Sequence, residues 1–461
     1  MRICIFVILS FININNVLAF GYSQTLPVMF IQTEDNKPIL TKTEYINATY
    51  YIDPMGIEGI DPIGSVANPL PLQIRGRGNF TWGYFDKKPY RIKLEKKQAL
   101  LGMKKSKHFA LLAHADNDYA FFRNTVAFEL SKRLDMPYTP AQQPLEVVLN
   151  GDYIGLYFLT ETIRVDADRV NITEQLDGET NEELISGGWL VEIDNNKDAN
   201  QIELTVDGTD LEWLWITYHS PEILSDEQKD YLYHQFESIK QAIYVKDKLS
   251  TKWEELIDIT SLAKYYIIHE IVDQLEGFLG SCYLYKNIKE TKWKFGPVWD
   301  FGNAFNKYHS KDKFIYQDSP FPASIINEIV KFPNFQKEVH LLWNKYYPEK
   351  LLGLNDFIRE FTQLINSAAV CDAQRWPEYG DADVSSSSDE VISSLNSKMS
   401  WLDKQFSSAN NINVAYNMDR GYSLYYDMWG RCVRNPQSKH LYLMKVYQPN
   451  GSVKVRKIVI P

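Results

Sequence analysis

The sequence predicts an α+β protein, with antiparallel strands in its first half, helices in its second half and a short β-rich tail. Apolar and polar residues alternate through residues 27–52 and 72–94, as in strands with one buried face. From residue 225 apolar residues recur at helical spacing, and alternation returns after residue 411. We therefore expect a β part packed beside a helical part, and a small C-terminal β-sandwich over residues 411–461.

The first 19 residues have the pattern of a secretion signal. Arg2 is followed by the apolar run 3–11, and Ala19 supplies a small residue at the expected cleavage point. The apolar run is too short to span a bilayer, and no later stretch is long and uncharged enough to do so. We therefore expect an exported protein, secreted or at the cell surface, without a transmembrane segment.

The charge balance argues against nucleic acid as a partner. The 461 residues carry a formal net charge of -10, with a pI near 5.4, so the chain offers no broad surface for neutralising a polyanion. Basic residues do gather between Lys87 and Lys107. This cluster fits either a focused anionic ligand or a solvated charged face.

The cysteines predict neither a zinc site nor a disulfide framework. Cys4 lies in the signal, and Cys282, Cys371 and Cys432 show no CxxC spacing. One bridge, between Cys282 and Cys371, is compatible with an oxidising compartment.

A glycine-bearing turn followed by a basic strand is the first candidate binding feature. After the predicted strands of residues 20–70, residues 72–82 are typical of a strand that runs into a turn, and residues 87–94 alternate basic and apolar side chains. A phosphate could be held by the free N–H groups of the turn and by four basic side chains, those of Arg75, Arg77, Lys88 and Lys93. The same side chains also suit an ordinary exposed sheet face.

Two further elements place acidic side chains near this sheet. Residues 118–134 predict a helix with a broad apolar face, on which Glu129 is a candidate partner for a sheet lysine. Asn150-Gly151 predicts a tight hairpin turn within residues 144–162, and Glu161 stands at the exit from that hairpin.

The helical half begins at the capping box Ser225-Asp-Glu-Gln228. A second helix, starting at Asp258, is apolar on most sides and is therefore expected to be buried. Three polar residues, Asp273, Gln274 and Glu276, stand at its end. More helices are predicted at 324–347, 354–368 and 389–406, with Ser385 to Ser388 as a linker and helix cap.

Asp300 is the candidate metal ligand. Trp293, Phe295 and Val298 predict a short apolar strand, and Asp300 follows where the backbone turns at Gly302. A carboxylate in this place can bind Mg²⁺ whose other ligands are nucleotide phosphates and waters. The alternative is an aspartate that caps the next segment through its side chain.

The order of these segments resembles the CotH family of atypical protein kinases, first known from spore coats. The resemblance covers roughly residues 70–310 and rests on the runs Arg75-Gly-Arg-Gly-Asn-Phe-Thr-Trp82, Lys88-Pro-Tyr-Arg-Ile-Lys93, Leu101-Gly-Met-Lys-Lys-Ser-Lys-His108, Arg123-Asn124, Asn150-Gly-Asp-Tyr-Ile-Gly-Leu-Tyr157, Glu161, Arg169-Val-Asn171 and Pro297-Val-Trp-Asp-Phe301. It implies a protein-kinase-like two-lobed fold over residues 71–406, with an antiparallel β small lobe and a helical large lobe. It also implies transfer of the γ-phosphoryl group of ATP to protein hydroxyls.

The resemblance assigns roles to individual residues. Asp300 resembles the aspartate that binds Mg²⁺ or Mn²⁺ in the Asp-Phe motif of the family. Lys88 is the expected nucleotide lysine, with Lys93 as the alternative, and Glu161 is expected to meet the ribose or that lysine. Two residues depart from the family, which commonly has Asn and Asp at the places of Gln274 and Glu276. Glu276 keeps a carboxylate able to accept a hydroxyl proton, and Asp273 is a candidate to compensate.

The tail resembles the C-terminal sorting domain of the type IX secretion system. The similarity rests on Tyr426-Asp-Met-Trp-Gly-Arg431, Leu441-Tyr-Leu-Met-Lys445 and Lys454-Val-Arg-Lys-Ile-Val459, with His440 in place of the usual glycine. It implies that the secretion machinery is a partner and that the protein passes through the periplasm.

Two functions follow as hypotheses. The first is a secreted, ATP- and Mg²⁺-dependent kinase of Ser and Thr in extracytoplasmic proteins. The second is a kinase-like surface protein, an adhesin or binding module, in which Gln274 and Glu276 mark lost chemistry. The 29 tyrosines and 11 tryptophans suit a contact surface as well as a core.

Overall fold

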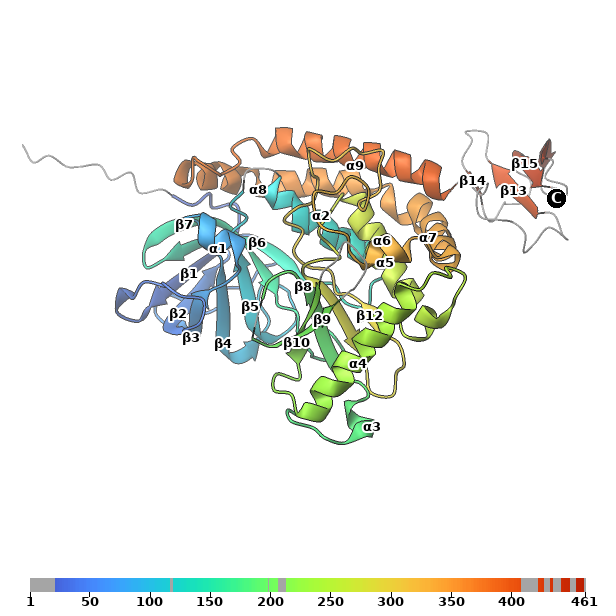
Figure 1. The fold of residues 1–461 in the computed structure, drawn as a ribbon. Helices are drawn as coiled ribbons and strands as arrows, with labels where there is room; N and C mark the ends of the chain where they lie inside the picture. Colours follow the sequence, from blue (N-terminus) through green and yellow to red (C-terminus); the bar gives the residue numbers. More distant parts are fainter. Residues whose placement is uncertain are drawn as a thin grey trace, which may run out of the picture. The chain divides into compact units, whose positions relative to one another are not determined.

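The structure is a computed structural model that describes residues 21–116, 119–197, 199–205 and 213–407. It also describes four strands beyond them, at 422–426, 432–433, 441–447 and 453–459. Strands and helices are both abundant, which confirms the α+β class (Figure 1). The chain divides into two compact units, Met1–Leu402 and Asp403–Pro461. The predicted signal at residues 1–19 lies outside the described residues.

Seven strands close into a barrel in the order β1-β2-β3-β4-β5-β7-β6. Their bounds are Val28–Thr33 (β1), Ile46–Asp53 (β2), Leu70–Gly76 (β3), Tyr90–Gln98 (β4), Ser106–Leu112 (β5), Gln142–Leu149 (β6) and Asp152–Glu161 (β7). All pairs are antiparallel except β1 with β6, which run parallel and close the barrel. Because β1 and β2 lie within residues 20–70, that segment shares one core with the strands that follow.

The barrel interior is filled by alternate residues of its strands. Tyr50, Ile74, Ile92 and Phe109 are among the buried members of this core. Since side chains alternate along a strand, the basic residues between them point outward. The register pairs Arg75 of β3 with Arg91 of β4. The predicted turn at Asn150-Gly151 is confirmed, with φ of 53° and 82° as a type I′ hairpin requires.

The closed seven-stranded barrel, and a second sheet beside the helices in the second half of the first unit, differ from the expected two-lobed kinase-like fold with an antiparallel β small lobe and a helical large lobe. The five-stranded antiparallel sheet has the order β12-β11-β8-β10-β9. Its strands are Trp189–Asp194 (β8), Gln201–Thr205 (β9), Trp213–Ser220 (β10), Cys282–Lys286 (β11) and Lys294–Phe295 (β12). One face is covered by helix α4, whose Phe236 and Ile239 line a small apolar cavity with Ile193 and Leu284 of the sheet.

The helices agree with the sequence at several caps. Ser225 Oγ accepts a hydrogen bond from Gln228 N at 3.1 Å, which confirms the capping box at the start of α4. Helix α5 is buried almost throughout, as its apolar surface predicts. The α-helices are Phe80–Tyr84 (α1), Ala120–Arg133 (α2), Glu182–Ile185 (α3), Asp226–Ile243 (α4), Ile259–Ile271 (α5), Ile325–Ile329 (α6), Pro333–Tyr346 (α7), Leu354–Arg375 (α8) and Val384–Phe406 (α9). Shorter helical turns lie at Glu34–Asn36 (η1), Lys252–Glu255 (η2) and Tyr347–Leu351 (η3).

Two sequence predictions differ from the structure. Ser385 to Ser388 form the first turn of α9 instead of a linker, because α9 begins at Val384. Cys282 and Cys371 are free thiols, on β11 and α8, so the proposed bridge between them is absent.

In the tail, the described strands are β13 (Tyr422–Tyr426), β14 (Cys432–Val433), β15 (Leu441–Tyr447) and β16 (Val453–Val459), and they form one antiparallel sheet. The β-sandwich expected over residues 411–461 stays a prediction, since the residues between these strands lie outside the described part of the chain.

The described helices were compared with the requirements of a membrane span. None of them combines the length and the apolar character needed to cross a bilayer.

A buried ion pair joins the barrel to the helices. Lys87 Nζ lies 2.7 Å from Asp372 Oδ1 of α8, and both side chains are about 1% exposed. The same oxygen accepts a hydrogen bond from Leu156 N of β7 at 2.8 Å. This contact requires a glycine at position 155, because an added Cβ would lie 2.1 Å from Asp372 Oδ1 and φ there is 109°.

We predict that Asp372→Ala destabilises the protein by roughly 3–5 kcal/mol, because it leaves the Lys87 ammonium buried without its anion. Chemical denaturation followed by circular dichroism measures the change. Arg359→Ala is the matched control, since it removes an exposed pair with Asp389 and should cost less than about 1 kcal/mol. Equal losses in the two variants would contradict a special role for the buried pair.

Candidate active site

Asp300 follows β12 in a stretch that is fixed by its backbone. Phe301 N donates a hydrogen bond to Asn124 Oδ1 of α2 at 2.9 Å, and Gln274 Nε2 donates one to Asp300 O at 3.2 Å. Gly302 N–H donates to the Asp300 carboxylate, so this side chain does cap the turn that follows. The residue is nevertheless exposed, although protein groups crowd its carboxylate, so the side chain is able to contact a ligand.

Arg77, in the glycine turn after β3, lies opposite Asp300. The pKa of the Asp300 carboxyl is raised, mainly because surrounding protein groups remove water from it. The charge of Arg77 acts to lower this pKa, and the charge of Glu192 raises it further. Burial likewise lowers the pKa of Arg77, and the charge of Asp300 opposes this shift. The Arg77 guanidinium also lies 5.7 Å from the centre of the Trp299 ring. The turn predicted to hold phosphate thus faces the predicted metal ligand.

The cationic side of this site comes from the outer face of the barrel. Arg75 and Arg91 are cross-strand neighbours, and each lowers the pKa of Arg77 through its charge. The Nε atoms of Arg75 and Arg91 are buried without a hydrogen-bond partner among the described residues. Unpaired buried donors are costly, and anionic oxygens would satisfy them.

The anionic side comes from the five-stranded sheet and the segment after α5. Glu276 Oε1 accepts a hydrogen bond from Asn195 Nδ2 at 2.6 Å, and Oε2 accepts one from Asn303. Burial raises the pKa of Glu276, and the charge of Asp300 raises it further. Glu192 pairs with His219 at 2.8 Å and helps burial to raise the pKa of Asp194 to about 6. We call Arg75, Arg77, Arg91, Glu192, Glu276 and Asp300 the charged junction.

The charged junction suits a metal ion that arrives with a phosphate ligand. Among the described residues no group of three or more His, Cys, Asp or Glu side chains is arranged to hold a metal by itself. Mg²⁺ at phosphoryl-transfer sites needs only one or two carboxylates besides phosphate and water. Beside Asp300, Gln274 Oε1 is buried and without a hydrogen-bond partner, and an amide oxygen is an acceptable Mg²⁺ ligand. Asp300 and Gln274 therefore fit the ion.

Asp273 belongs to a separate buried ion network. It lies 2.8 Å from His309 Nδ1, 2.6 Å from Lys311 Nζ and 3.2 Å from Lys398 Nζ of α9. Burial acts to raise the pKa of Asp273, but the bond to His309 and the two lysine charges outweigh it and hold the pKa below its usual range. Because its oxygens are engaged in this way, Asp273 orders the segment after Asn306 instead of compensating for Glu276.

The structure places three other predicted site residues outside the charged junction. Lys88 Nζ donates a hydrogen bond to Trp82 O at 2.8 Å, and the Lys93 ammonium lies 6.0 Å from the Tyr45 ring. Glu161 is buried and forms an ion pair with Arg169 at 2.8 Å. Their assignments to the nucleotide remain predictions. Glu129, the other candidate partner of a lysine, pairs with Arg133.

Several residues of this site escaped the sequence analysis. Arg91 was missed, although it lies two residues before Lys93 on the same strand and so on the same face. The alternation of residues along the strand could have placed Arg91 on the face that Arg75 shares. Glu192 and Asn195 gave no local signal, because only the pairing of β8 with β11 brings them near residues 276 and 300. Lys87 stands next to the predicted Lys88 in the segment before β4, but its side chain is buried against Asp372 of α8.

Comparison with known proteins identifies the family. A sequence model of a family described as CotH kinase protein matches residues 74–402, more than half of the chain. No protein with a curated description matches the chain.

We predict that Asp300→Asn raises the melting temperature at pH 7 by about 1–3 °C in the absence of ligands. The pKa of this carboxyl is raised in the folded state, so its ionised form costs stability at neutral pH. That cost disappears as the pH falls through the folded-state pKa, and the two proteins should then melt alike near pH 4.

Differential scanning calorimetry between pH 4 and 8 measures this difference. Asp61→Asn is the control, because Asp61 is exposed and lies outside the charged junction. A melting temperature for Asp300→Asn below that of the wild type at pH 7 would show that the carboxylate stabilises the fold.

Proposed function

The chain belongs to the CotH kinase protein family, and from that premise we propose that it is a secreted atypical protein kinase. Its reaction would transfer the γ-phosphoryl group of ATP to Ser or Thr hydroxyls of extracytoplasmic proteins. The observation that carries the proposal is the position of Arg77 opposite Asp300, with unpaired guanidinium donors beside it. A site of this kind has the charges that a nucleoside triphosphate needs.

The arginines bind and orient the phosphates. Arg75, Arg77 and Arg91 present charged donors on one side, and bidentate donors of this type suit phosphate oxygens. Asp300 and Gln274 would hold Mg²⁺, which supplies charge neutralisation for the phosphate oxygens when bound. The position of Arg77 close to Asp300 sets the distance between the arginines that bind phosphate and the residues that would hold the metal.

Glu276 is the group placed to accept a proton. In the transfer, the acceptor oxygen forms a bond to the γ-phosphorus, the bond to the leaving oxygen of ADP breaks, and the hydroxyl proton passes to a carboxylate. The pKa of Glu276 is raised, first by burial and then by Asp300, so it is a stronger base than an ordinary glutamate. Asn195 and Asn303 hold the carboxylate in one orientation.

The export part of the proposal rests on the two ends of the chain. The signal pattern at residues 1–19 favours passage out of the cytoplasm. The tail sequence, similar to a type IX sorting domain, supports delivery to the cell surface or the medium by that machinery, and its described strands form a separate four-stranded sheet.

One observation favours the second hypothesis, a kinase-like binding module. Both oxygens of Glu276 already accept hydrogen bonds, from Asn195 and Asn303, so they are less free to take a proton. Such a protein could still bind nucleotide at the arginines. Label transfer separates the two functions.

We predict that the wild-type protein transfers label from γ-labelled ATP to a generic protein substrate with Mg²⁺ or Mn²⁺. Asp300→Asn should reduce this transfer at least about 100-fold, because it removes a metal-binding charge needed in the transition state. Asp61→Asn, at an exposed position, should keep full activity. Absence of transfer by the wild type, or equal transfer by Asp300→Asn, would refute the kinase assignment.

We predict that Arg77→Met weakens ATP binding by about tenfold or more, since a charge-assisted contact to phosphate is lost. Lys88→Met tests the lysine assignment. Because the Lys88 ammonium is hydrogen-bonded to the Trp82 carbonyl, its removal should change the Kd for ATP by less than about threefold. Isothermal titration calorimetry gives both values, with the exposed Lys104→Met as control. If Lys88→Met has the larger effect, then Lys88 is the nucleotide lysine.

A further inference from the structure

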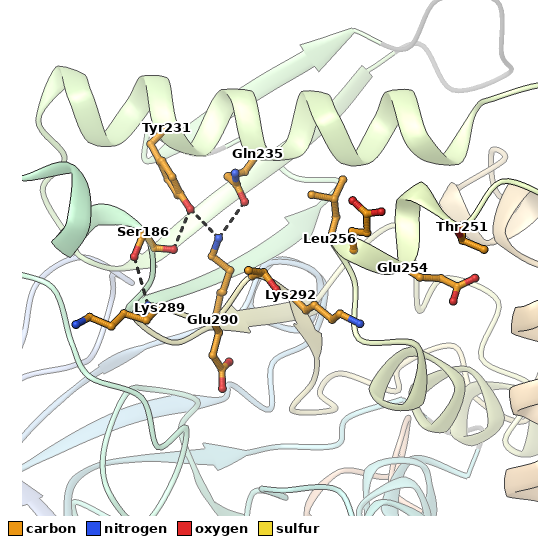
Figure 2. A pocket seen from close by; sticks show the side chains of 12 residues that line it. Ser186, Tyr231, Gln235, Thr251, Glu254, Leu256, Lys289, Glu290 and Lys292 are labelled. Atoms are coloured by element: carbon orange, nitrogen blue, oxygen red, sulfur yellow. Dashed lines mark hydrogen bonds between the residues drawn. The ribbon is translucent and has the colours of Figure 1, made fainter.

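A pocket of about 780 Å³ lies on the α4 side of the five-stranded sheet (Figure 2). Its lining includes Tyr231 and Gln235 of α4, Lys286 at the end of β11, and the segment around Glu254. Side chains alternate between the faces of a strand, so Lys286 points to the face opposite Tyr283, which approaches Arg77. This pocket is therefore separate from the charged junction, and its volume is that of a small-molecule site.

Lys286 lines this pocket with a buried charge that lacks an anion. The residue is 2% exposed, and its Nζ donates hydrogen bonds to Tyr231 Oη at 2.7 Å and Gln235 Oε1 at 2.9 Å. Both acceptors are neutral, and no carboxylate of the described residues lies within ion-pair distance of Nζ. A lysine ammonium has three donors, so one remains, and buried charges are ordinarily paired. Burial lowers the pKa of Lys286 to about 8, and the charge of Glu290 opposes the shift.

The acidic residues around the pocket are mostly engaged elsewhere. Glu290 pairs with Lys294 at 2.8 Å, and Glu254 accepts a hydrogen bond from Asn334 at 2.8 Å. At the rim, Lys289 pairs with Glu183 at 3.0 Å. None of these groups reaches Lys286, so its charge is not balanced by the lining.

A second donor beside Lys286 also lacks an acceptor. The Lys286 ammonium lies 5.5 Å from the centre of the Trp293 ring, and Trp293 Nε1 is buried with no hydrogen-bond partner among the described residues. Trp293 lies behind the lining, which adds the hydroxyl groups of Thr251 and Thr291. Lys286 therefore brings to the pocket a charged donor that the protein does not fully satisfy, which favours a ligand with acceptor oxygens.

We propose that this pocket binds a small organic carboxylate whose carboxylate group pairs with Lys286. A single buried ammonium balances a single negative charge. The other charged side chains of the lining are two lysines, Lys289 and Lys292, and three glutamates, Glu254, Glu255 and Glu290, whose net charge of -1 opposes a dianion such as a phosphate monoester. The ring face of Tyr231 near Nζ and the side chain of Leu256 provide apolar contact for the rest of the ligand. This site is independent of the proposed kinase function.

The probe is benzoate, compared with benzamide, which has the same shape and no charge. We expect benzoate to raise the melting temperature of the full chain in a concentration-dependent way, and benzamide to have no effect. Lys286→Met should abolish the benzoate effect, while Lys289→Met, which removes only the rim pair with Glu183, should keep it. Phenyl phosphate should bind more weakly than benzoate.

A pH series on the wild type tests the same idea without a variant. Benzoate affinity should fall by about tenfold per pH unit above pH 8, as the ammonium of Lys286 loses its proton. Benzoate should also protect Lys286 from an amine-reactive reagent, read by mass spectrometry of its peptide. Arg77→Met should bind benzoate like the wild type, which keeps this result distinct from any failure to bind ATP.

Three outcomes would overturn the proposal. They are an equal response to benzoate and benzamide, no response to either, and a benzoate response that survives in folded Lys286→Met. Tighter binding of phenyl phosphate than of benzoate would overturn the assigned ligand class.

Discussion

The buried pair of Lys87 and Asp372 is the contact on which the arrangement of the two halves depends. Asp372 comes from α8, whereas Lys87 and Leu156 belong to the barrel, so one carboxylate fixes three chain segments that are distant in sequence. A buried ion pair adds little net stability but penalises every arrangement in which it is broken. The barrel is thereby held in a defined orientation, with the strands bearing Arg75 and Arg91 toward the sheet that bears Glu192.

This orientation brings together charges that do not neutralise each other fully. Arg75, Arg77 and Arg91 lie close enough to disfavour one another's charges, and Glu276 and Asp300 do the same on the other side. Natural folds keep such repulsion mainly where a ligand relieves it. Lys286 shows the same imbalance on the opposite face of the sheet, with a single buried ammonium. In both places the unpaired group is a cation, which is notable in a chain whose net charge is -10.

Sequence reasoning succeeded where the signal was local. The Asn150-Gly151 turn and the Ser225 capping box depend on a few adjacent residues, and both are present. Sequence reasoning was less informative where partners are far apart in the chain. Asp273 contacts His309 and Lys398, which lie 36 and 125 positions later, and these contacts separate it from Gln274 and Glu276, with which it was predicted to act. The parallel closure of β1 on β6 likewise has no signature within either strand.

The choice between Lys87 and Lys88 illustrates a limit of alternation patterns. Both lysines lie just before β4 begins at Tyr90, where no strand alternation fixes the direction of a side chain. Lys87 is buried against Asp372, whereas Lys88 donates a hydrogen bond to the Trp82 carbonyl. The sequence alone does not show which of the two adjacent lysines, Lys87 or Lys88, is buried.

Helix α9 has a consequence for where the protein tolerates being shortened. Lys398, about four turns from its start at Val384, supplies one of the ammonium groups that surround Asp273 and also lies 3.2 Å from Glu270. A chain ending just after Phe406 keeps all of these contacts. One that stops before residue 398 leaves two buried carboxylates, Glu270 and Asp273, short of a counter-charge next to the Gln274–Glu276 segment, and the folded unit therefore extends to α9 even though the charged junction lies far earlier in the chain.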